Sequence, residues 1–382
     1  MTFDTQKYLL DCIRAKTESD FKAKLKSAGN PDWEWLAGEA FRGFMPVYLK
    51  AKKIHADLNM PQEIEDRLHL QYLLRARRSE GIEKAVLEVA REFNRSGIEL
   101  ILLKGAALIL TLYKKDAALR PMSDIDILVR KADMPRAEDL LRSLGYEEDY
   151  PRLSKRFKTL LSRDYFLNHG VHFVYFRGDV RLELHWNISS ECHPALLKQL
   201  SDDTVKNFVH EVEIKTLRPE ANLYSACYNF IKDFRTEQSF LRHHRKEETN
   251  MFCRVLAFFC EIKIMIRDYE SALSWDRFAL LVKQMNKEYE IYALLLMAKK
   301  VVAADIPDSV MVNAKRCFWV SIYLLGGCHK ENDLMRLLAC YERISCLRNL
   351  VSRGVRCIKS PKAAFSKIYS KLIHWLQTGA MG

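Results

Sequence analysis

Two aspartates one residue apart, Asp124 and Asp126, are the residues of this chain whose types and spacing could do chemistry. They lie in the sequence DIDILV, where acidic and apolar residues alternate as they do in a strand with one polar and one buried face. Both carboxylates therefore point to the same side, about 7 Å apart by the usual rise per residue. Hard oxygen ligands in this arrangement suit Mg²⁺, which one or two carboxylates often hold together with substrate phosphates. A solvated strand face or a turn is the alternative interpretation.

The stretch before this strand offers a place for phosphate groups. An apolar segment from Glu99 to Leu103 predicts a strand, and Lys104 and Gly105 end it just before a short apolar helix. Backbone N–H groups at the start of a helix favour anions, and the lysine adds a positive charge. We therefore expect one element to hold phosphates and the next to hold the metal ion.

A β-hairpin is predicted where HFVYFR and VRLELHW flank a Gly-Asp link at 178–179. Arg181, Glu183 and His185 share one face of its second strand. Such a polar face suits a functional site better than the interior of a sheet. The alternative is a surface Glu183 paired with Arg181, and the pattern leaves open whether His172 or His185 takes part in chemistry.

Together these motifs resemble a known family. The order strand, Gly-small, helix and Asp-x-Asp strand is similar to the core of the nucleotidyltransferase superfamily that includes DNA polymerase beta. LLKGAAL, DIDILV and LGY at 144–146 resemble more closely the uncharacterised bacterial nucleotidyltransferases with an LKG motif. The superfamily pattern has Gly-Gly or Gly-Ser where this chain has Gly105 and Ala106, so no serine hydroxyl is available to the phosphates.

The resemblance implies a third carboxylate beside the aspartate pair, in a strand that ends acid-x-His-Trp. The implied catalytic and metal-binding residues are Asp124, Asp126 and Glu183, with Mg²⁺ or Mn²⁺ as the ion. The implied nucleotide-binding residues are Lys104, Gly105, Ala106 and Arg120. The implied reaction moves a nucleoside monophosphate from an NTP, with ATP as the expected donor, to an acceptor and releases pyrophosphate. The acceptor is a small molecule, peptide or saccharide that the sequence does not identify.

Composition limits the partners and the compartment. The chain has 61 basic and 49 acidic residues, a net charge of +12 that suits acidic partners such as nucleotides, and no motif points to nucleic acid. Its 10 cysteines include no Cys-x-x-Cys pair, which predicts buried thiols and not a cysteine zinc site or a disulfide framework. Neither a signal peptide nor a membrane-length apolar run is evident, so we expect a cytoplasmic protein, and the resemblance implies a bacterial one.

The order of elements predicts an α+β protein in three parts. Residues 1–96 form an N-terminal helical region, 97–215 a polymerase-beta-like nucleotidyltransferase core with a small mixed sheet, and 216–382 a C-terminal helical domain. A long helix should begin at Pro61 and end before Gly97.

Further helices follow from capping residues and periodicity. Asp133 should cap a helix over Met134–Leu144, and Ser274 should begin another. The expected C-terminal helices are Leu223–Phe234, Phe252–Ile266, Phe278–Met285, Tyr289–Val302 and Leu334–Cys346.

Three basic segments could contact acidic partners. The segment Pro151–Leu167 could lie over the nucleotide, and Arg242–Lys246 is expected to be a solvated loop, with a substrate clamp as the alternative. The tail Cys346–Gly382 carries seven basic residues and no acidic one, with apolar residues at helical spacing. Weak contact with an anionic membrane surface is one expectation for this tail, and a docked terminal helix is the other.

Two other functions fit an Asp-x-Asp motif. A glycosyltransferase would use it to hold a metal-bound nucleotide-sugar, although such enzymes have a larger nucleotide-binding α/β domain. A non-catalytic member of the same fold would bind nucleotide or a partner protein. Release of pyrophosphate distinguishes a nucleotidyltransferase from the first, which releases UDP or GDP, and from the second, which turns nothing over.

Overall fold

The computed structural model describes residues 61–114, 117–120, 122–149, 163–189, 192–241 and 248–310, with a few positions between 13 and 34. The predictions for the basic loop at 242–246, the helix at 334–346, the C-terminal tail and most of the basic segment at 151–167 lie outside these residues. Among the helices of the described residues, none combines the length and the apolar character needed to span a membrane.

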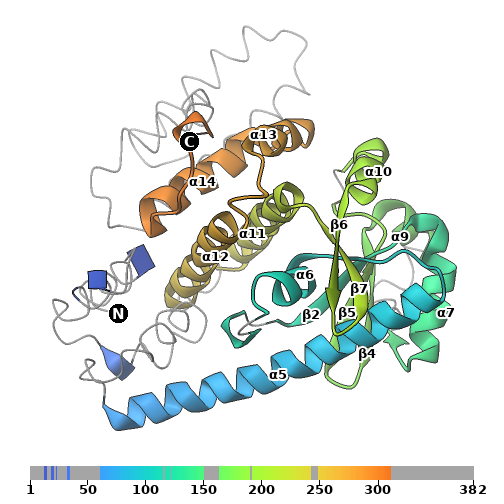
Figure 1. Ribbon diagram of the computed structural model, residues 1–382, viewed down its shortest axis with the longest axis horizontal. Coiled ribbons are helices and arrows are strands. Elements are labelled where there is room, and N and C mark those ends of the chain that lie inside the picture. Colours follow the sequence, from blue (N-terminus) through green and yellow to red (C-terminus); the bar gives the residue numbers. More distant parts are fainter. Residues whose placement is uncertain are drawn as a thin grey trace, which may run out of the picture.

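A mixed sheet of seven strands forms the centre of the fold, in the order β3-β4-β5-β2-β1-β7-β6 (Figure 1). Strand β2 pairs in parallel with β5 and antiparallel with β1, which in turn pairs in parallel with β7. The predicted α+β class is therefore confirmed. In chain order the strands are β1 (Ile101–Leu102), β2 (Asp124–Leu128), β3 (Glu147–Glu148), β4 (His172–Arg177), β5 (Val180–His185), β6 (Thr204–Val209) and β7 (Val212–Leu217).

Local pattern explains the central strands. In β2, Ile125 and Ile127 are fully buried on one side, which leaves the two aspartates on the other. The predicted hairpin of β4 and β5 is confirmed, and Gly178 occupies its turn with φ +56°. Strand β1 is shorter than the predicted Glu99–Leu103: Leu103 still donates its N–H to the carbonyl oxygen of Asp126 at 3.0 Å, but the chain turns immediately afterwards.

A second hairpin, formed by β6 and β7, was not predicted. Its two-residue tip is His210 and Glu211, which both adopt the left-handed conformation, with φ +46° and +63°. Two-residue hairpin turns usually carry Gly or Asn at such positions, so the local signal for this turn is weak. Phe208 on β6 is exposed, which also obscures the alternation expected of a half-buried strand.

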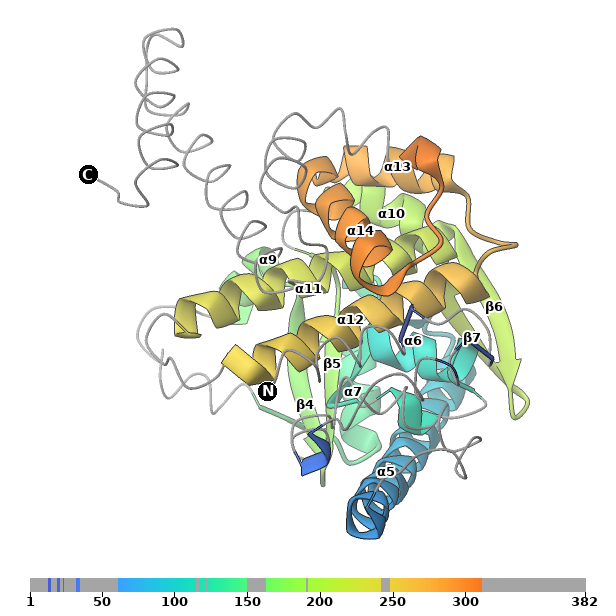
Figure 2. The same cartoon turned by 90° about the vertical axis from the view of Figure 1, so that its left-hand side faces the viewer.

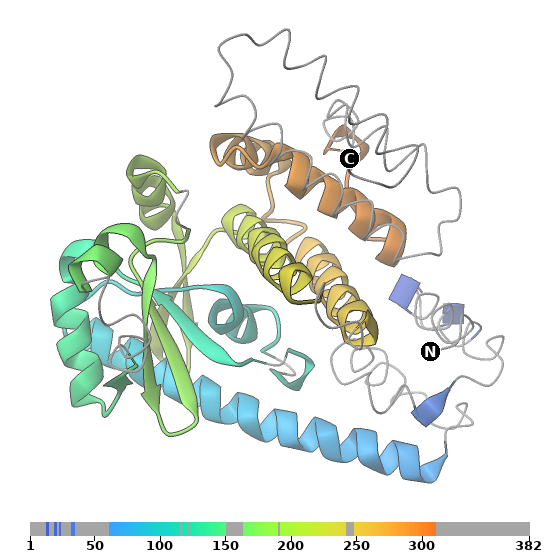
Figure 3. The ribbon, with the colours of Figure 1, turned by 180° about the vertical axis from the view of Figure 1, so that it is seen from behind.

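Helices surround the sheet. The long helix α5 begins after Pro61 and ends just before Gly97, as predicted, and it runs from the side of the C-terminal helices to the sheet, along which its second half packs (Figures 1 and 3). The α-helices are α5 (Gln62–Arg95), α6 (Lys104–Thr111), α7 (Met134–Ser143), α9 (Arg163–His169), α10 (Pro194–Asp202), α11 (Pro219–Leu241), α12 (Glu248–Asp268), α13 (Trp275–Gln284) and α14 (Glu288–Val302), with 3-10 turns at η2 (Ala117–Leu119) and η3 (Lys131–Asp133).

The two predicted helix starts differ in detail. At α13 the backbone of Ser274 is extended and its hydroxyl accepts the Arg277 N–H at 3.3 Å, so this prediction is confirmed. At α7 the helix is where it was predicted, but the side chain of Asp133 makes no capping hydrogen bond. Asp133 already has helical backbone angles and pairs with Arg130 Nε at 2.8 Å, whereas a cap needs extended backbone.

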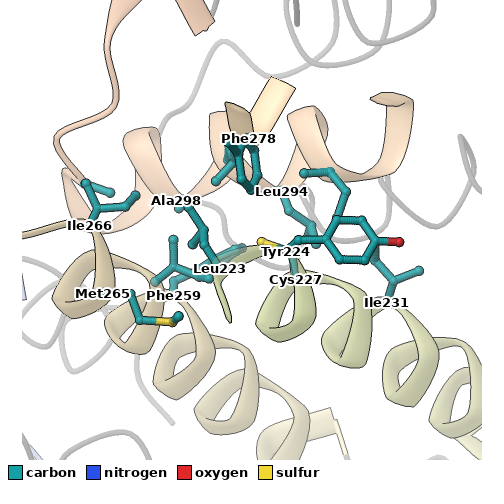
Figure 4. Close-up of a cluster of buried hydrophobic side chains, with 14 of the residues drawn as sticks. Leu223, Tyr224, Cys227, Ile231, Phe259, Met265, Ile266, Phe278, Leu294 and Ala298 are labelled. Atoms are coloured by element: carbon teal, nitrogen blue, oxygen red, sulfur yellow. The ribbon is translucent and has the colours of Figure 1, made fainter. Parts of the chain in front are cut away.

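Helix α6 joins two hydrophobic cores. One core lies between the sheet, α5 and α7, and includes Ala106 and Ile109 of α6. The other is built by α11, α12, α13 and α14 and includes Leu108 of α6; Figure 4 shows its centre around Phe259 and Phe278. Helix α6 lies between the sheet and the paired helices α11 and α12 (Figures 2 and 3). Packing on both sides therefore holds the N-terminus of α6 beside the aspartates of β2.

Candidate active site

The parallel pairing of β2 with β5 brings together the three acidic residues singled out in the sequence. Asp124 lies opposite Arg181 and Asp126 opposite Glu183, so all three carboxylates are on one face of adjacent strands. We call Asp124, Asp126 and Glu183 the acidic cluster. Three negative charges on one face require positive charges nearby, and side chains from β5 and α6 supply them.

Asp126 is the most buried member of the acidic cluster, with only 2% of its surface exposed. Its Oδ1 forms an ion pair with Lys104 Nζ and lies 2.9 Å from His185 Nε2. Burial alone would raise the pKa of this carboxyl. The hydrogen bond with His185 and the charge of Lys104 outweigh burial and hold the pKa well below its usual value. Asp126 is therefore ionised and already holds two partners.

Glu183 is buried among four cationic or imidazole groups. Arg181 Nη2 donates to its Oε1 at 2.5 Å. Its Oε2 lies 3.3 Å from His185 Nε2, 3.7 Å from His172 Nε2 and 3.8 Å from Lys104 Nζ. Burial would raise its pKa, but the hydrogen bond with His185 and the nearby His172 lower it. The carboxylate is thus available as an anionic ligand.

Asp124 is the member of the acidic cluster that is open to solvent, with 27% of its side chain exposed. Its Oδ1 accepts a hydrogen bond from Ser123 Oγ at 3.0 Å, and Arg181 Nη1 is 4.0 Å from its Oδ2. Burial, followed by the charges of Asp126 and Glu183, raises the pKa of Asp124. A carboxylate that is destabilised by its neighbours and less tightly paired is the one that gains most from a bound cation.

Lys104 begins α6 in an unusual backbone conformation. Its φ is +46°, in the left-handed region that a lysine rarely adopts. Residues held there cost of order 1–3 kcal/mol and cluster at functional sites. The turn directs Nζ of Lys104 to Asp126 and Glu183, and although burial would lower the pKa of Lys104, the charge of Asp126 raises it.

Gly105 allows the side chain of Arg120 to pack against the backbone of α6. A Cβ at position 105 would lie 2.5 Å from Arg120 Nη1 and 3.2 Å from Met122 Cγ. Arg120 is itself fixed, because its Nε pairs with Glu261 of α12 at 2.7 Å. Sequence reasoning missed Glu261, which lies in a helix with no motif that would single it out.

Gly105→Ala is therefore expected to lower the free energy of unfolding by about 1–3 kcal/mol, the usual cost of overpacking a fixed contact. Urea unfolding would measure it. The matched control is Gly81→Ala in the middle of α5, where an added Cβ meets nothing within 4 Å. This control should gain about 0.5–1 kcal/mol from the better helix propensity of alanine. A Gly105→Ala chain as stable as the wild type would show that Arg120 moves freely.

His172 and His185, whose part in the chemistry the sequence did not decide, lie side by side. His172 of β4 lies directly opposite His185 of β5, with ring centroids 4.7 Å apart. Burial and the charge of His185 lower the pKa of His172 to about 4. Burial would also lower the pKa of His185, but its hydrogen bonds to Asp126 and Glu183 raise it. The neighbouring carboxylates therefore favour the protonated form of His185, whereas His172 is neutral.

Comparisons with known proteins give one family match and one remote structural similarity. A family model described as "Uncharacterised nucleotidyltransferase" matches residues 31–303. None of the curated proteins matches the chain. Among solved structures, the solution structure of the antibiotic-resistance factor ANT(2'')-Ia aligns with 11% identity and a TM-score of 0.29, covering 55% of this chain and 98% of that one.

Proposed function

Because the chain belongs to the family of uncharacterised nucleotidyltransferases, we propose that it transfers a nucleoside monophosphate from an NTP, with ATP as the expected donor, to an acceptor nucleophile and releases pyrophosphate. The family establishes an enzyme that transfers a nucleotidyl group, and it confirms the resemblance drawn from the LKG and Asp-x-Asp motifs. The donor, the acceptor, the metal ion and the roles of individual residues are our proposal. The observation that carries it is the acidic cluster on β2 and β5.

The donor set of the acidic cluster fits Mg²⁺ or Mn²⁺, because three carboxylates on one face provide the hard oxygen ligands that these ions take. Asp124, Asp126 and Glu183 would hold the ion. When bound, it supplies charge neutralisation at the phosphates and orientation of the reacting oxygens. Lys104, Arg181 and His185 balance part of the negative charge of the acidic cluster, which supports a place for positive charge at this point.

Deprotonation of the acceptor and binding of the triphosphate would be carried out by residues of the chain itself. We propose that Glu183 completes the metal site and takes the proton of the acceptor. Its lowered pKa makes it a modest base, so positioning and charge neutralisation would supply most of the rate. Lys104 and the backbone N–H groups of Gly105 and Ala106 at the start of α6 would bind the triphosphate. Arg120 is paired with Glu261, and we propose that it supports this turn through its contact with Gly105.

Lys104→Ala tests the phosphate role. Removing the charge should raise the dissociation constant for ATP with Mg²⁺ about 10- to 100-fold, because a charge-assisted contact is worth about 1.5–3 kcal/mol. Isothermal titration calorimetry would measure it. Lys84→Ala, which removes an exposed lysine of α5, is the matched control and should bind as the wild type does. If the dissociation constant of Lys104→Ala is unchanged, Lys104 does not bind phosphate and acts only through its ion pair with Asp126.

The experiment that tests the function itself is a screen of the four labelled NTPs against cell extract with Mg²⁺ present. We expect a labelled product and one pyrophosphate for each nucleotide transferred. Release of UDP or GDP from a nucleotide-sugar would instead favour a glycosyltransferase. Tight NTP binding without turnover on any acceptor would favour a non-catalytic member of the fold.

A further inference from the structure

A second group of ligands lies beside the acidic cluster and has a different chemistry. His172, Glu183 and His185 each present one ligand atom, and these atoms all lie within 4.8 Å of one another. The two histidines are directly opposite each other on β4 and β5, and Glu183 is two residues before His185 on the same face. The antiparallel register of the hairpin thus fixes all three.

The two distances from Glu183 to the histidines are close to those of a tetrahedral metal site. Ligand atoms bound to zinc at about 2.0–2.1 Å in tetrahedral geometry are about 3.4 Å apart. Glu183 Oε2 lies 3.3 Å from His185 Nε2 and 3.7 Å from His172 Nε2. Only small side-chain movements would therefore bring the three atoms onto one ion. Neither histidine Nδ1 has a hydrogen-bond partner in the described part of the chain, and His185 is held through its Nε2, 2.9 Å from Asp126 Oδ1.

We propose that His172, Glu183 and His185 form a binding site for Zn²⁺ or a transition-metal ion of similar ligand preference. This site shares Glu183 with the proposed Mg²⁺ site but differs from it in having two nitrogen ligands. Imidazole nitrogen prefers Zn²⁺ to Mg²⁺, whereas the acidic cluster offers only oxygen. Three protein ligands leave one coordination position open. The ion would take the place of the proton through which His185 contacts Asp126 and Glu183.

Because the two metal sites share Glu183, an ion bound at one should weaken binding at the other; this expectation rests on the proposed function. A zinc ion held by the histidines withdraws Glu183 from the acidic cluster and adds a positive charge near Lys104, 3.8 Å from the same oxygen. Zinc should therefore weaken the binding of Mn²⁺ to the acidic cluster. This competition can be measured by the paramagnetic relaxation that bound Mn²⁺ causes, without any turnover.

The test titrates metal-depleted full-length protein with Zn²⁺ against a chromogenic chelator. We expect one tight site for each chain, and His172→Asn should weaken it by about 100-fold or more, since it removes one of three ligands. His210→Asn is the matched control: His210 is an exposed histidine at the tip of the β6–β7 hairpin and should leave zinc affinity unchanged. Equal zinc affinity of the His172→Asn and wild-type chains would overturn the proposal.

Cobalt provides a measurement that needs no variant. Co²⁺ bound by two imidazoles and a carboxylate shows visible ligand-field bands without the near-ultraviolet charge-transfer absorption of a cobalt thiolate. A strong thiolate band would place the ion on the cysteines and overturn the proposal. The outcomes also separate this inference from the proposed function: a chain that binds zinc through His172 but releases no pyrophosphate from any NTP contradicts only the latter. A chain that releases pyrophosphate but binds zinc equally well without His172 contradicts only the former.

Discussion

Asp124→Asn is expected to lower nucleotidyl transfer by about 10³-fold or more and to leave the fold intact. A metal ion supplies several kcal/mol of charge stabilisation, and about 4 kcal/mol corresponds to roughly 10³-fold in rate. Asp124 is partly exposed, and burial with the charges of Asp126 and Glu183 raises its pKa, so the fold disfavours its negative charge. A neutral side chain should therefore change the free energy of unfolding by less than about 1 kcal/mol.

Single-turnover rates with Mg²⁺ and urea unfolding would check both parts of this prediction. Ser123→Ala is the control, because it removes the hydrogen bond to Asp124 and leaves its charge. It should cost no more than about tenfold in rate. If Asp124→Asn keeps the wild-type rate, the acidic cluster is not the catalytic centre. If it unfolds the protein instead, Asp124 is structural.

Asp126→Asn is expected to destabilise the protein by about 3–5 kcal/mol in addition to abolishing transfer. Asp126 is buried and pairs with both Lys104 and His185. Replacing it with a neutral amide leaves Lys104 and His185 with the longer contacts to Glu183, 3.8 and 3.3 Å, in a largely buried site, and removing one partner is the costly way to break a buried ion pair. The sequence alone treats Asp124 and Asp126 as equivalent, and only their burial and partners predict that their variants differ in stability.

A double-mutant cycle identifies the cause. Lys104→Met removes the charge and keeps the aliphatic length, so the Lys104→Met, Asp126→Asn double variant should recover at least about 1 kcal/mol relative to the sum of the single changes. Urea unfolding of the four proteins would measure this coupling. Strictly additive effects would show that Lys104 contributes nothing to holding Asp126. Asp126→Asn as stable as the wild type would contradict the buried pairing altogether.

The local pattern of apolar and polar residues was sufficient to predict the strands that carry the acidic cluster. Alternation in DIDILV and on both sides of the Gly178 turn predicted β2 and the β4–β5 hairpin, because side-chain direction in a strand depends only on position along the chain. The same pattern failed for β6 and β7, where the turn residues His210 and Glu211 lack the usual signature. The family resemblance drawn from the sequence is confirmed by the family model that matches residues 31–303.

Tertiary structure alone decided which charges face the acidic cluster. His185 reaches Asp126 across 59 residues of sequence, and Glu261 reaches Arg120 across 141. Such contacts depend on the order of strands in the sheet and on the packing of α12 against α6, neither of which any local spacing encodes. For that reason the sequence identified Asp124, Asp126 and Glu183 as candidates, whereas their unequal burial, their cationic partners and the placement of His172 beside Glu183 followed only from the fold.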